Sequence, residues 1–403
     1  GLIITVDNGT NAKDEIDFAE KSGVRVIVTD HHLPDHNFAT SATAILNPNR
    51  PDCLSEFKSY SGGGMALILC MAIAKSIKNL NYISKDLIVL ATISSIADMV
   101  PLVGDNRRLI KSGLKNIKNS NIIGLSLLLD RLYLSGPEDL SARDVAFRIA
   151  PLINAAGKFG LAQSAINLLT SNDRNTINSS IKELLSISAK RRELLAKAAV
   201  DLDPQVKEQS ASRRGFIFVQ GEHRSAINGL LAIRIMESKK IPTFVGSSEG
   251  EYLKISGRST GEVNLSKIIE ETGDIHSGGG GHAFAAGVRV KKENLDRFLV
   301  AVENSIKKQL MEQNSQKFWE IDGEVSTSQI SQSLIKSFKM IGPFGKGNEP
   351  PIFSIVGAEI KKEIIGSKVN FYLNCPAGKI RVTFSDETTS ADETLGGSKI
   401  LGE

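Results

Sequence analysis

The feature that most constrains the fold is a strand–helix–strand pattern at the start of the chain. Residues Leu2–Val6 form an apolar, β-branched run that predicts a buried strand. Residues Lys13–Ser22 have helical spacing and end before Gly23, and Val24–Thr29 predicts a second strand. Short links between such elements are typical of the βαβ unit of a parallel sheet. The sequence therefore predicts an α/β fold built on a parallel sheet.

Carboxylate and imidazole side chains follow both predicted strands. Asp7 ends the first strand, and Asp30, His31 and His32 end the second. Ligands of parallel sheets bind beyond the carboxyl ends of the strands, so we expect these side chains to lie close together. With Asp98 they offer the oxygen and nitrogen ligands that suit Mn²⁺, Mg²⁺ or zinc. The pattern favours a metal site, and a site with two metal ions would be suited to phosphodiester hydrolysis.

Each of these residues also has an ordinary structural interpretation. Asp7–Gly9 has the composition of a common turn, and His31 with His32 can form a surface turn. Asp98 can cap the turn before Pro101. Only their combination after two strands of one βαβ unit favours a metal site.

Composition limits the class of protein without identifying it. The chain has 403 residues, 41% hydrophobic and 23% charged, which is typical of a globular protein with two or three domains. Its three cysteines show no C-x-x-C spacing, so we expect reduced thiols in a cytoplasmic protein. Neither a membrane span nor a signal peptide is predicted. The net charge of +4 permits a polyanionic partner but does not require one.

The rest of the chain divides into further predicted domains. The first α/β domain is expected at residues 1–172 and a connector helix at 173–205, with its helical pattern over 176–203. A plain core helix is the alternative for that segment. A second α/β domain is expected at 206–315 and a small β-rich domain at 316–403.

Two segments outside the first constellation could contact an anionic ligand or could simply be turns. The Asn154 amide and the Lys158 ammonium are able to hold phosphate oxygens, whereas Gly157 would also suit a helix end. The segment Ile341–Asn348 is a Gly/Pro-rich link from a helix to a strand. Within it, Phe344 either stacks on a base or packs internally.

A third segment combines a cation with a run of glycines. Arg258 is suited to bidentate phosphate binding. The run Gly278–Gly281 precedes His282, and glycines let a backbone approach a nucleotide closely. A flexible loop is the plain alternative, although the small residues after His282 favour an ordered loop.

Five segments, in this order, resemble the motifs of the DHH phosphoesterase family: Val6–Gly9, Val28–His32, Ser95–Leu102, Asn154–Lys158 and Gly280–Gly287. The resemblance covers nearly the whole chain. The segment Ile341–Asn348, inside a β-rich domain, resembles the oligonucleotide-binding barrel of the RecJ-type members. The resemblance implies a DHH domain, a connector helix, a DHH-associated α/β domain and an OB-like C-terminal β-barrel.

The resemblance also implies a function and metal ligands. RecJ-type enzymes digest single-stranded DNA from the 5′ end with Mn²⁺ or Mg²⁺, here expected as two ions, in recombination and repair. Asp7, His31 and Asp98 would be metal ligands. His32 would be a further ligand or contact the scissile phosphate, and Asp30 would orient a histidine.

Substrate contacts and partners follow from the same resemblance. Arg258 and His282, with Gly280 and Gly281, would hold the nucleotide strand between the two α/β domains, together with the Asn154–Lys158 motif. The expected partner is single-stranded DNA, with a single-strand-binding protein and a helicase as further candidates. We expect a monomer without membrane association.

The sequence departs from the family pattern in several places. No Asp-x-Asp strand precedes Leu2, and the last barrel strands are not evident, so we expect a fragment that binds DNA weakly and hydrolyses it poorly. Leu152 and Lys158 stand where RecJ-type members carry arginine, and His223 lies one residue farther from the next glycine. Two alternatives stay open: a DHH enzyme acting on short RNA or cyclic dinucleotides, and a non-catalytic nucleic-acid-binding module.

Overall fold

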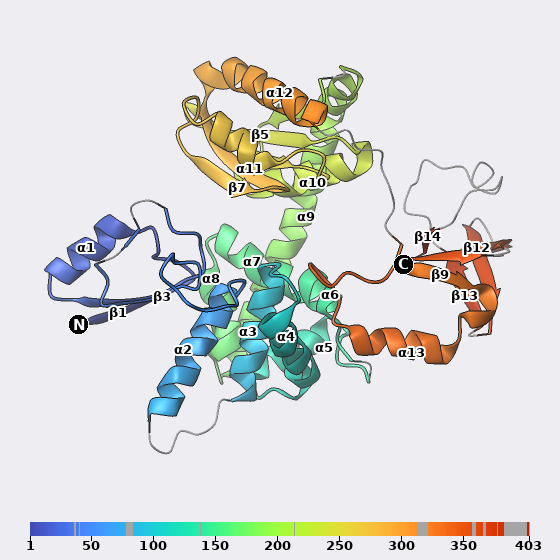
Figure 1. Ribbon diagram of the computed structural model, residues 1–403, viewed down its shortest axis with the longest axis horizontal. Coiled ribbons are helices and arrows are strands. Elements are labelled where there is room, and N and C mark those ends of the chain that lie inside the picture. The colour runs from blue at the N-terminus through green and yellow to red at the C-terminus, as the bar shows by residue number, and fades with distance from the viewer. Residues whose placement is uncertain are drawn as a thin grey trace. The chain divides into compact units, whose positions relative to one another are not determined.

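The computed structural model forms two compact units. Figure 1 labels their helices and strands. Unit 1 comprises residues 1–154, 166–178 and 318–403, and unit 2 comprises residues 155–165 and 179–317. The structure describes residues 1–35, 38–39, 41–77, 84–137, 139–212, 214–312, 321–356, 360–365, 368–376, 378–382 and 401–402.

Unit 1 begins with a three-stranded parallel sheet. The strands β1 (Leu2–Val6), β2 (Arg25–Thr29) and β3 (Ala44–Leu46) lie in that order, and α1 (Lys13–Lys21) connects the first two. The predicted βαβ unit and its parallel sheet are therefore confirmed. The core beneath β2 contains Ile16, Val26, Val28 and Ala39. Because the register pairs Val6 with Thr29, the two strands end at the same edge of the sheet.

Helices follow the parallel sheet along the chain. They are α2 (Gly62–Ser76), α3 (Lys85–Ala97), α4 (Gly104–Asn116), α5 (Ile123–Arg131), α6 (Ala142–Asp144), a π-helical turn (Val145–Ile149), α7 (Ala150–Lys158) and α8 (Ala162–Thr170), the last two running into unit 2. A Ser61 side chain caps α2 by accepting from the Gly64 N–H. Helices α2, α3 and α4 pack against one another in sequence order.

The connector helix is longer than predicted. Helix α9 runs over Arg174–Ala211 and passes through Pro204, where the sequence pattern had placed its end. A proline removes one main-chain hydrogen bond from a helix interior. Burial of Ala198, Leu202 and Val206, spaced four residues apart on one side of α9, stabilises the turns on both sides of it.

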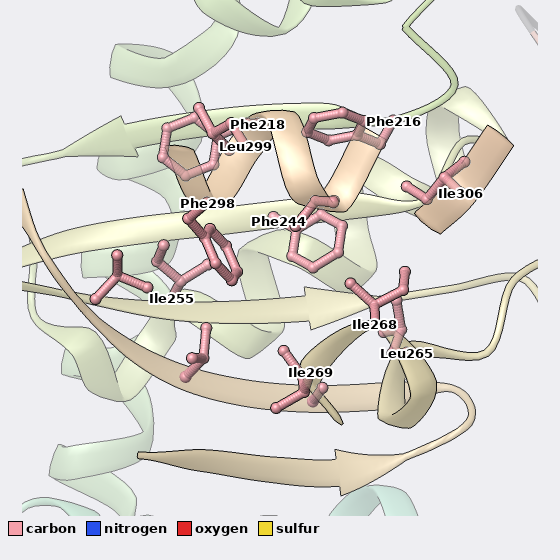
Figure 2. Packing of buried hydrophobic residues seen from close by; sticks show 14 of the residues in the cluster. Phe216, Phe218, Phe244, Ile255, Leu265, Ile268, Ile269, Phe298, Leu299 and Ile306 are labelled. Atoms are coloured by element: carbon pink, nitrogen blue, oxygen red, sulfur yellow. The ribbon is translucent and has the colours of Figure 1, made fainter. Parts of the chain in front are cut away.

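Unit 2 contains a five-stranded mixed sheet in the order β4-β5-β6-β8-β7. The strands are β4 (Ile217–Gly221), β5 (Thr243–Glu249), β6 (Tyr252–Arg258), β7 (Gly279–His282) and β8 (Ala285–Lys291); the helices are α10 (Asn228–Lys239), α11 (Leu265–Glu271) and α12 (Leu295–Glu312). Figure 2 shows the core on one side of this sheet, where Phe216, Phe244 and Phe298 pack with aliphatic side chains of α11 and α12. Alanine, leucine and isoleucine side chains of α9 and α10 form a second core with β4 and β5.

The expectation that Gly278–Gly281 forms a loop is wrong for most of the run. Gly279–His282 is the edge strand β7, which pairs antiparallel with β8. A Cβ atom on Gly281 would lie closer than 3.0 Å to the backbone of Ala285 and Ala286. The glycines therefore permit an unusually close strand pairing, a role that composition alone did not separate from loop flexibility.

The C-terminal part of unit 1 is β-rich, as predicted, and its described residues include the helix α13. One sheet has the order β14-β10-β9 and the other has the order β11-β12-β13. The elements are β9 (Gly323–Ser326), α13 (Gln332–Ile341), β10 (Phe353–Val356), β11 (Ile360–Ile365), β12 (Lys368–Cys375), β13 (Gly378–Val382) and β14 (Leu401–Gly402). Pairing among the described strands does not close a barrel. In the β-rich domain expected at 316–403, β9 begins at Gly323, and residues 316–320 and 383–400 lie outside the described part of the chain.

Short 3-10 turns complete the fold at Ile117–Asn119, Ser225–Ile227, Lys292–Asn294 and Thr327–Gln329. Within the described ranges, no helix combines the length and the apolar composition that crossing a bilayer requires.

Candidate metal centre and phosphate-binding residues

Three of the predicted metal ligands meet at the edge of the sheet in unit 1. Asp7 follows β1, His31 follows β2 by one residue, and Asp98 directly follows α3. The Nε2 atom of His31 lies 3.0 Å from Oδ1 of Asp7 and 3.6 Å from Oδ2 of Asp98. One imidazole nitrogen thus faces two carboxylates that are separated by about ninety positions in the chain.

The electrostatics of this cluster favour a cation. The hydrogen bond that Asp7 accepts from His31 raises the pKa of His31; burial opposes this rise, and the charge of Asp98 adds to it. Burial raises the pKa of Asp98. A divalent ion would compete with protons for these atoms, because metal ligands bind as carboxylates and neutral imidazoles. Two carboxylates and an imidazole match the ligand preference of Mn²⁺, and of Mg²⁺ where water completes the shell.

Asp30 lies behind the cluster and is almost inaccessible to solvent, with 2% of its side chain exposed. Its Oδ1 atom accepts from the main-chain N–H groups of His31 and His32 at 2.8 and 3.3 Å, and its Oδ2 atom accepts from the Thr10 N–H at 3.0 Å. Burial alone would raise the pKa of Asp30, but these hydrogen bonds lower it from 3.8 to about 2. Asp30 is therefore ionised at neutral pH and can only accept hydrogen bonds.

The same carboxylate fixes the ring of His32. The Nδ1 atom of His32 lies 2.7 Å from Oδ1 of Asp30, and since an ionised carboxylate only accepts, Nδ1 is the donor of this pair. A neutral ring in this tautomer has its lone pair on Nε2. The ligand-capable atoms of Asp7, Asp30, His31 and His32 all lie within 4.8 Å of one another. This geometry supports the orienting role predicted for Asp30 and leaves His32 free to bind an ion or a phosphate.

Sequence reasoning missed the amides that hold the histidine segment in place. Nδ2 of Asn47 donates to the Thr10 hydroxyl and to the His32 carbonyl oxygen, both at 2.8 Å. Nδ2 of Asn49 donates to the His31 carbonyl oxygen at 2.6 Å. An Asn-Pro-Asn sequence directly follows β3, the third strand of the same parallel sheet. Its place at a strand end could have indicated that these amides lie near the candidate ligands.

Sequence reasoning also missed Gly62, the first residue of α2. Asp7 has a left-handed backbone with φ of 63°, which turns its carboxylate toward that helix. A Cβ atom on Gly62 would lie closer than 3.0 Å to the Cβ, Cγ and Oδ1 atoms of Asp7. The position of the Asp7 carboxylate therefore requires glycine at residue 62.

A cavity of about 660 Å³ adjoins the candidate ligands within unit 1. Asp7, Asp98 and Asn154 are among its lining residues, and most of the others are apolar side chains of α2, α3 and α8. The structure thus brings the predicted Asn154 to the same cavity as the two carboxylates. Lys158 is the last residue of α7, and its side chain lies outside the described part of the structure.

The segment Ile341–Asn348 lies against the stretch that follows Asp98. The Leu102 N–H donates to the Lys346 carbonyl oxygen at 2.7 Å, and the Arg107 guanidinium donates to the first carbonyl oxygen of the segment. Lys346 is exposed, and it is one of the cations that oppose the rise in the pKa of Asp98 caused by burial. The segment places a cation near the candidate metal ligands, which its Gly/Pro composition did not predict.

In unit 2, Arg258 and His282 lie in one row across three strands. The register pairs Arg258 of β6 with Ala285 of β8, and Ala285 with His282 of β7. The guanidinium of Arg258 packs on Gly229, where a Cβ atom would lie 2.6 Å from Nη2. Burial lowers the pKa of Arg258, and none of the described carboxylates forms an ion pair with it. A half-buried cation without such a partner is suited to an anionic ligand.

We predict that Gly62→Ala weakens Mn²⁺ binding at least tenfold, because the added methyl group displaces the Asp7 carboxylate. Isothermal titration calorimetry with Mn²⁺ measures the affinity directly. Gly136→Ala is the control, since a Cβ atom at that position would meet no atom within 4 Å. An unchanged Mn²⁺ affinity in a folded Gly62→Ala protein would remove Asp7 from the ligand set.

We predict that Asp30→Asn weakens Mn²⁺ binding by about 10- to 100-fold, the usual effect of losing a group that orients a ligand. The variant should also lose on the order of 2 kcal/mol of stability at pH 7, since the folded-state pKa of Asp30 is about 2 instead of 3.8. A carboxylate whose pKa is lowered by folding stabilises the folded state. For Asp30 this stabilisation is fully present above pH 3.8 and is lost as the pH falls toward 2.

Urea unfolding without metal, repeated from pH 7 downward, measures this contribution. The difference between parent and Asp30→Asn should stay constant down to about pH 5 and shrink below pH 4. The control is Asp130→Asn, at an exposed aspartate, which should change neither the Mn²⁺ affinity nor the free energy of unfolding. Equal stability of parent and Asp30→Asn at pH 7 contradicts the proposed network.

Comparison with known families assigns three regions of the chain. Residues 1–94 match the DHH family N-terminal domain, residues 216–308 match the DHHA1 domain, and residues 321–384 match the RecJ OB domain. The order of the three is the order expected from the sequence motifs.

Similar proteins and structures agree with these matches. The chain is 28% identical over 386 residues to the single-stranded-DNA-specific exonuclease RecJ of Dickeya dadantii, covering 91% of this chain and 67% of that protein. The RecJ of Bacillus subtilis is 29% identical, with 87% of this chain and 44% of that protein covered. The chain thus spans between about half and two thirds of these relatives.

Two solved structures show the same fold. The Mn²⁺ complex of RecJ from Thermus thermophilus superposes with a TM-score of 0.81 at 27% identity, covering 96% of this chain and 57% of that one. An exonuclease RecJ bound to manganese superposes with a TM-score of 0.60 at 30% identity, covering 78% of both chains. By its three matched domains and these relatives, the chain belongs to the RecJ-type members of the DHH family.

Proposed function

We propose that this chain provides the catalytic part of a metal-dependent exonuclease that hydrolyses single-stranded DNA from the 5′ end in recombination and repair. The observation that carries the proposal is the meeting of His31 with Asp7 and Asp98 at the sheet edge. The names of the relatives supply the substrate, and two of the similar structures contain manganese or Mn²⁺. We propose Mn²⁺ or Mg²⁺ as the cofactor, with two ions in the site.

A bound divalent cation in such a site lowers the pKa of water and neutralises charge on the attacked phosphate. Asp7, His31 and Asp98 would hold it, and Asp30 would keep the His32 ring with Nε2 available to the ion or to a phosphate oxygen. Asp30 accepts hydrogen bonds from the main-chain N–H groups of both histidines, which holds the histidine segment beside the other candidate ligands.

Substrate contacts come from both units, each by its own residues. In unit 1 we propose Asn154 of α7, and Lys346 near Asp98. We also propose Lys158, the last residue of α7, which belongs to unit 2. In unit 2 we propose Arg258 and the β7 residues Gly280, Gly281 and His282. Cationic and amide groups at such sites bind phosphate oxygens through charge-assisted hydrogen bonds.

We also propose that the protein acts in the cytoplasm as a monomer, with a single-strand-binding protein and a helicase as partners. The cysteine pattern supports the location, because all three cysteines are free thiols. The partners rest on the resemblance to RecJ-type enzymes and on the matched OB domain.

The proposal predicts that His31→Ala and Asp98→Ala each lower the rate of Mn²⁺-dependent hydrolysis of long single-stranded DNA at least a hundredfold. This loss corresponds to a rise of about 2.7 kcal/mol in the activation barrier. Binding of the DNA should change far less, because the phosphate contacts remain. A fluorescence nuclease assay, with anisotropy binding in the absence of metal, separates the two effects.

Asp130→Ala, an exposed carboxylate on α5, is the matched control and should retain the parental rate. A dinucleotide substrate in the same assay tests the alternative activity. Faster cleavage of the dinucleotide than of the long strand would favour the short-RNA or cyclic-dinucleotide enzymes. A tenfold loss of rate corresponds to a rise of about 1.4 kcal/mol in the activation barrier. If His31→Ala or Asp98→Ala loses less than that, the substituted residue is not a catalytic ligand.

A further inference from the structure

Strands β6 and β8 of unit 2 have two faces of opposite character. Burial alternates along both strands: Leu253, Ile255, Ala286, Val288 and Val290 point into the core, where α11 and α12 pack against them. Figure 2 shows this core face with Ile255 beside Phe244 and Phe298. The residues between them are exposed or half-buried on the opposite face, which we call the outer face.

The strand register orders the outer face into three rows. Lys254 pairs with Arg289 in the first row, Ser256 with Gly287 and then Gly280 in the second, and Arg258 with Ala285 and then His282 in the third. The first and third rows contain the cations. The second row contains no side chain larger than serine.

The two cations of the first row are available to a ligand. Lys254 and Arg289 are exposed, and no described carboxylate lies within ion-pair distance of either. The guanidinium of Arg289 lies over the Tyr252 ring at 4.0 Å, a contact that restricts its position. A restricted, unpaired cation loses less entropy when it binds an anion than a free side chain does.

The spacing of the rows fits a repeating anion. Residues two apart on a strand lie about 6.7 Å from each other, so the first and third rows are about 13 Å apart along β6. Between them, a Cβ atom on Gly280 would meet nothing within 4 Å, and Gly287 is exposed. Sugar and base groups between two bound phosphates would therefore meet backbone rather than side chains.

We propose that the outer face of β6, β8 and β7 is a binding surface for the backbone of a single DNA strand, in which Lys254 and Arg289 contact a phosphate beyond the one held by Arg258 and His282. The inference rests on the proposed function and makes it more specific, because only a strand longer than a dinucleotide reaches both cationic rows. A flat, partly glycine surface with unpaired cations contacts the sugar–phosphate backbone and reads little sequence.

The test replaces Lys254 and Arg289 with glutamine, singly and together. Anisotropy binding of a long oligothymidylate is measured without metal at several salt concentrations between about 50 and 200 mM. The slope of log affinity against log salt is negative, and each substitution should reduce its magnitude by about 0.7, the double variant by about 1.4. Binding of a thymidine dinucleotide should be unchanged, because it ends at the Arg258 row.

Matched controls come from the opposite side of the sheet. Lys267→Gln on α11 and Arg297→Gln on α12 remove exposed cations from the helices that cover the core face, and neither should alter the slope. Equal slopes for Lys254→Gln, Arg289→Gln and these controls would overturn the proposal, as would an equal loss of dinucleotide binding.

The outcome is independent of the nuclease assay. A reduced slope in a protein that fails to hydrolyse DNA with Mn²⁺ would support the binding surface and reject the proposed activity. Normal hydrolysis with control-like slopes would reject the surface and leave the activity in place. Thermal unfolding of each variant should match the parent, since both side chains are exposed.

Discussion

The candidate metal centre depends on the buried carboxylate of Asp30. Its two oxygens bind three main-chain N–H groups and the His32 ring, and those hydrogen bonds set the direction in which the chain leaves β2. Only 2% of the Asp30 side chain is exposed, so water cannot replace the hydrogen bonds of its carboxylate. Breaking any of them would therefore destabilise the fold. The placement of His31 opposite Asp7 and Asp98 follows from that constraint.

Glycines give the site its remaining precision. Gly62 leaves space for the Asp7 carboxylate at the start of α2, and Gly229 leaves space for the Arg258 guanidinium in unit 2. At both places a single methyl group would occupy the volume of a functional side chain. Neither glycine offers a ligand atom. Each contributes by leaving the space that a functional side chain occupies.

The sequence pattern predicted β1 and β2, their parallel order and the meeting of Asp7 with the residues after β2, because strand ends in one βαβ unit share an edge. Asp98 was predicted as a ligand from its residue type and from the family motif, since it follows the helix α3 and not a strand. Strand β3 was not predicted. The pattern also did not predict Asn47, Asn49, Gly62 or Lys346. Their roles depend on contacts between distant segments, which no local period reveals. The run before His282 was misinterpreted for a similar reason, since glycine suits both a loop and a close strand pair and only the pairing with β8 decides between them.

The most direct test of the metal centre is anomalous diffraction from crystals of the protein grown with Mn²⁺. The account predicts an anomalous peak within about 2.3 Å of side-chain atoms of Asp7, His31 and Asp98, with Asp30 bonded to His32 and outside the coordination sphere. Mn²⁺ bound away from these three side chains, or no peak among them at saturating Mn²⁺, would contradict it.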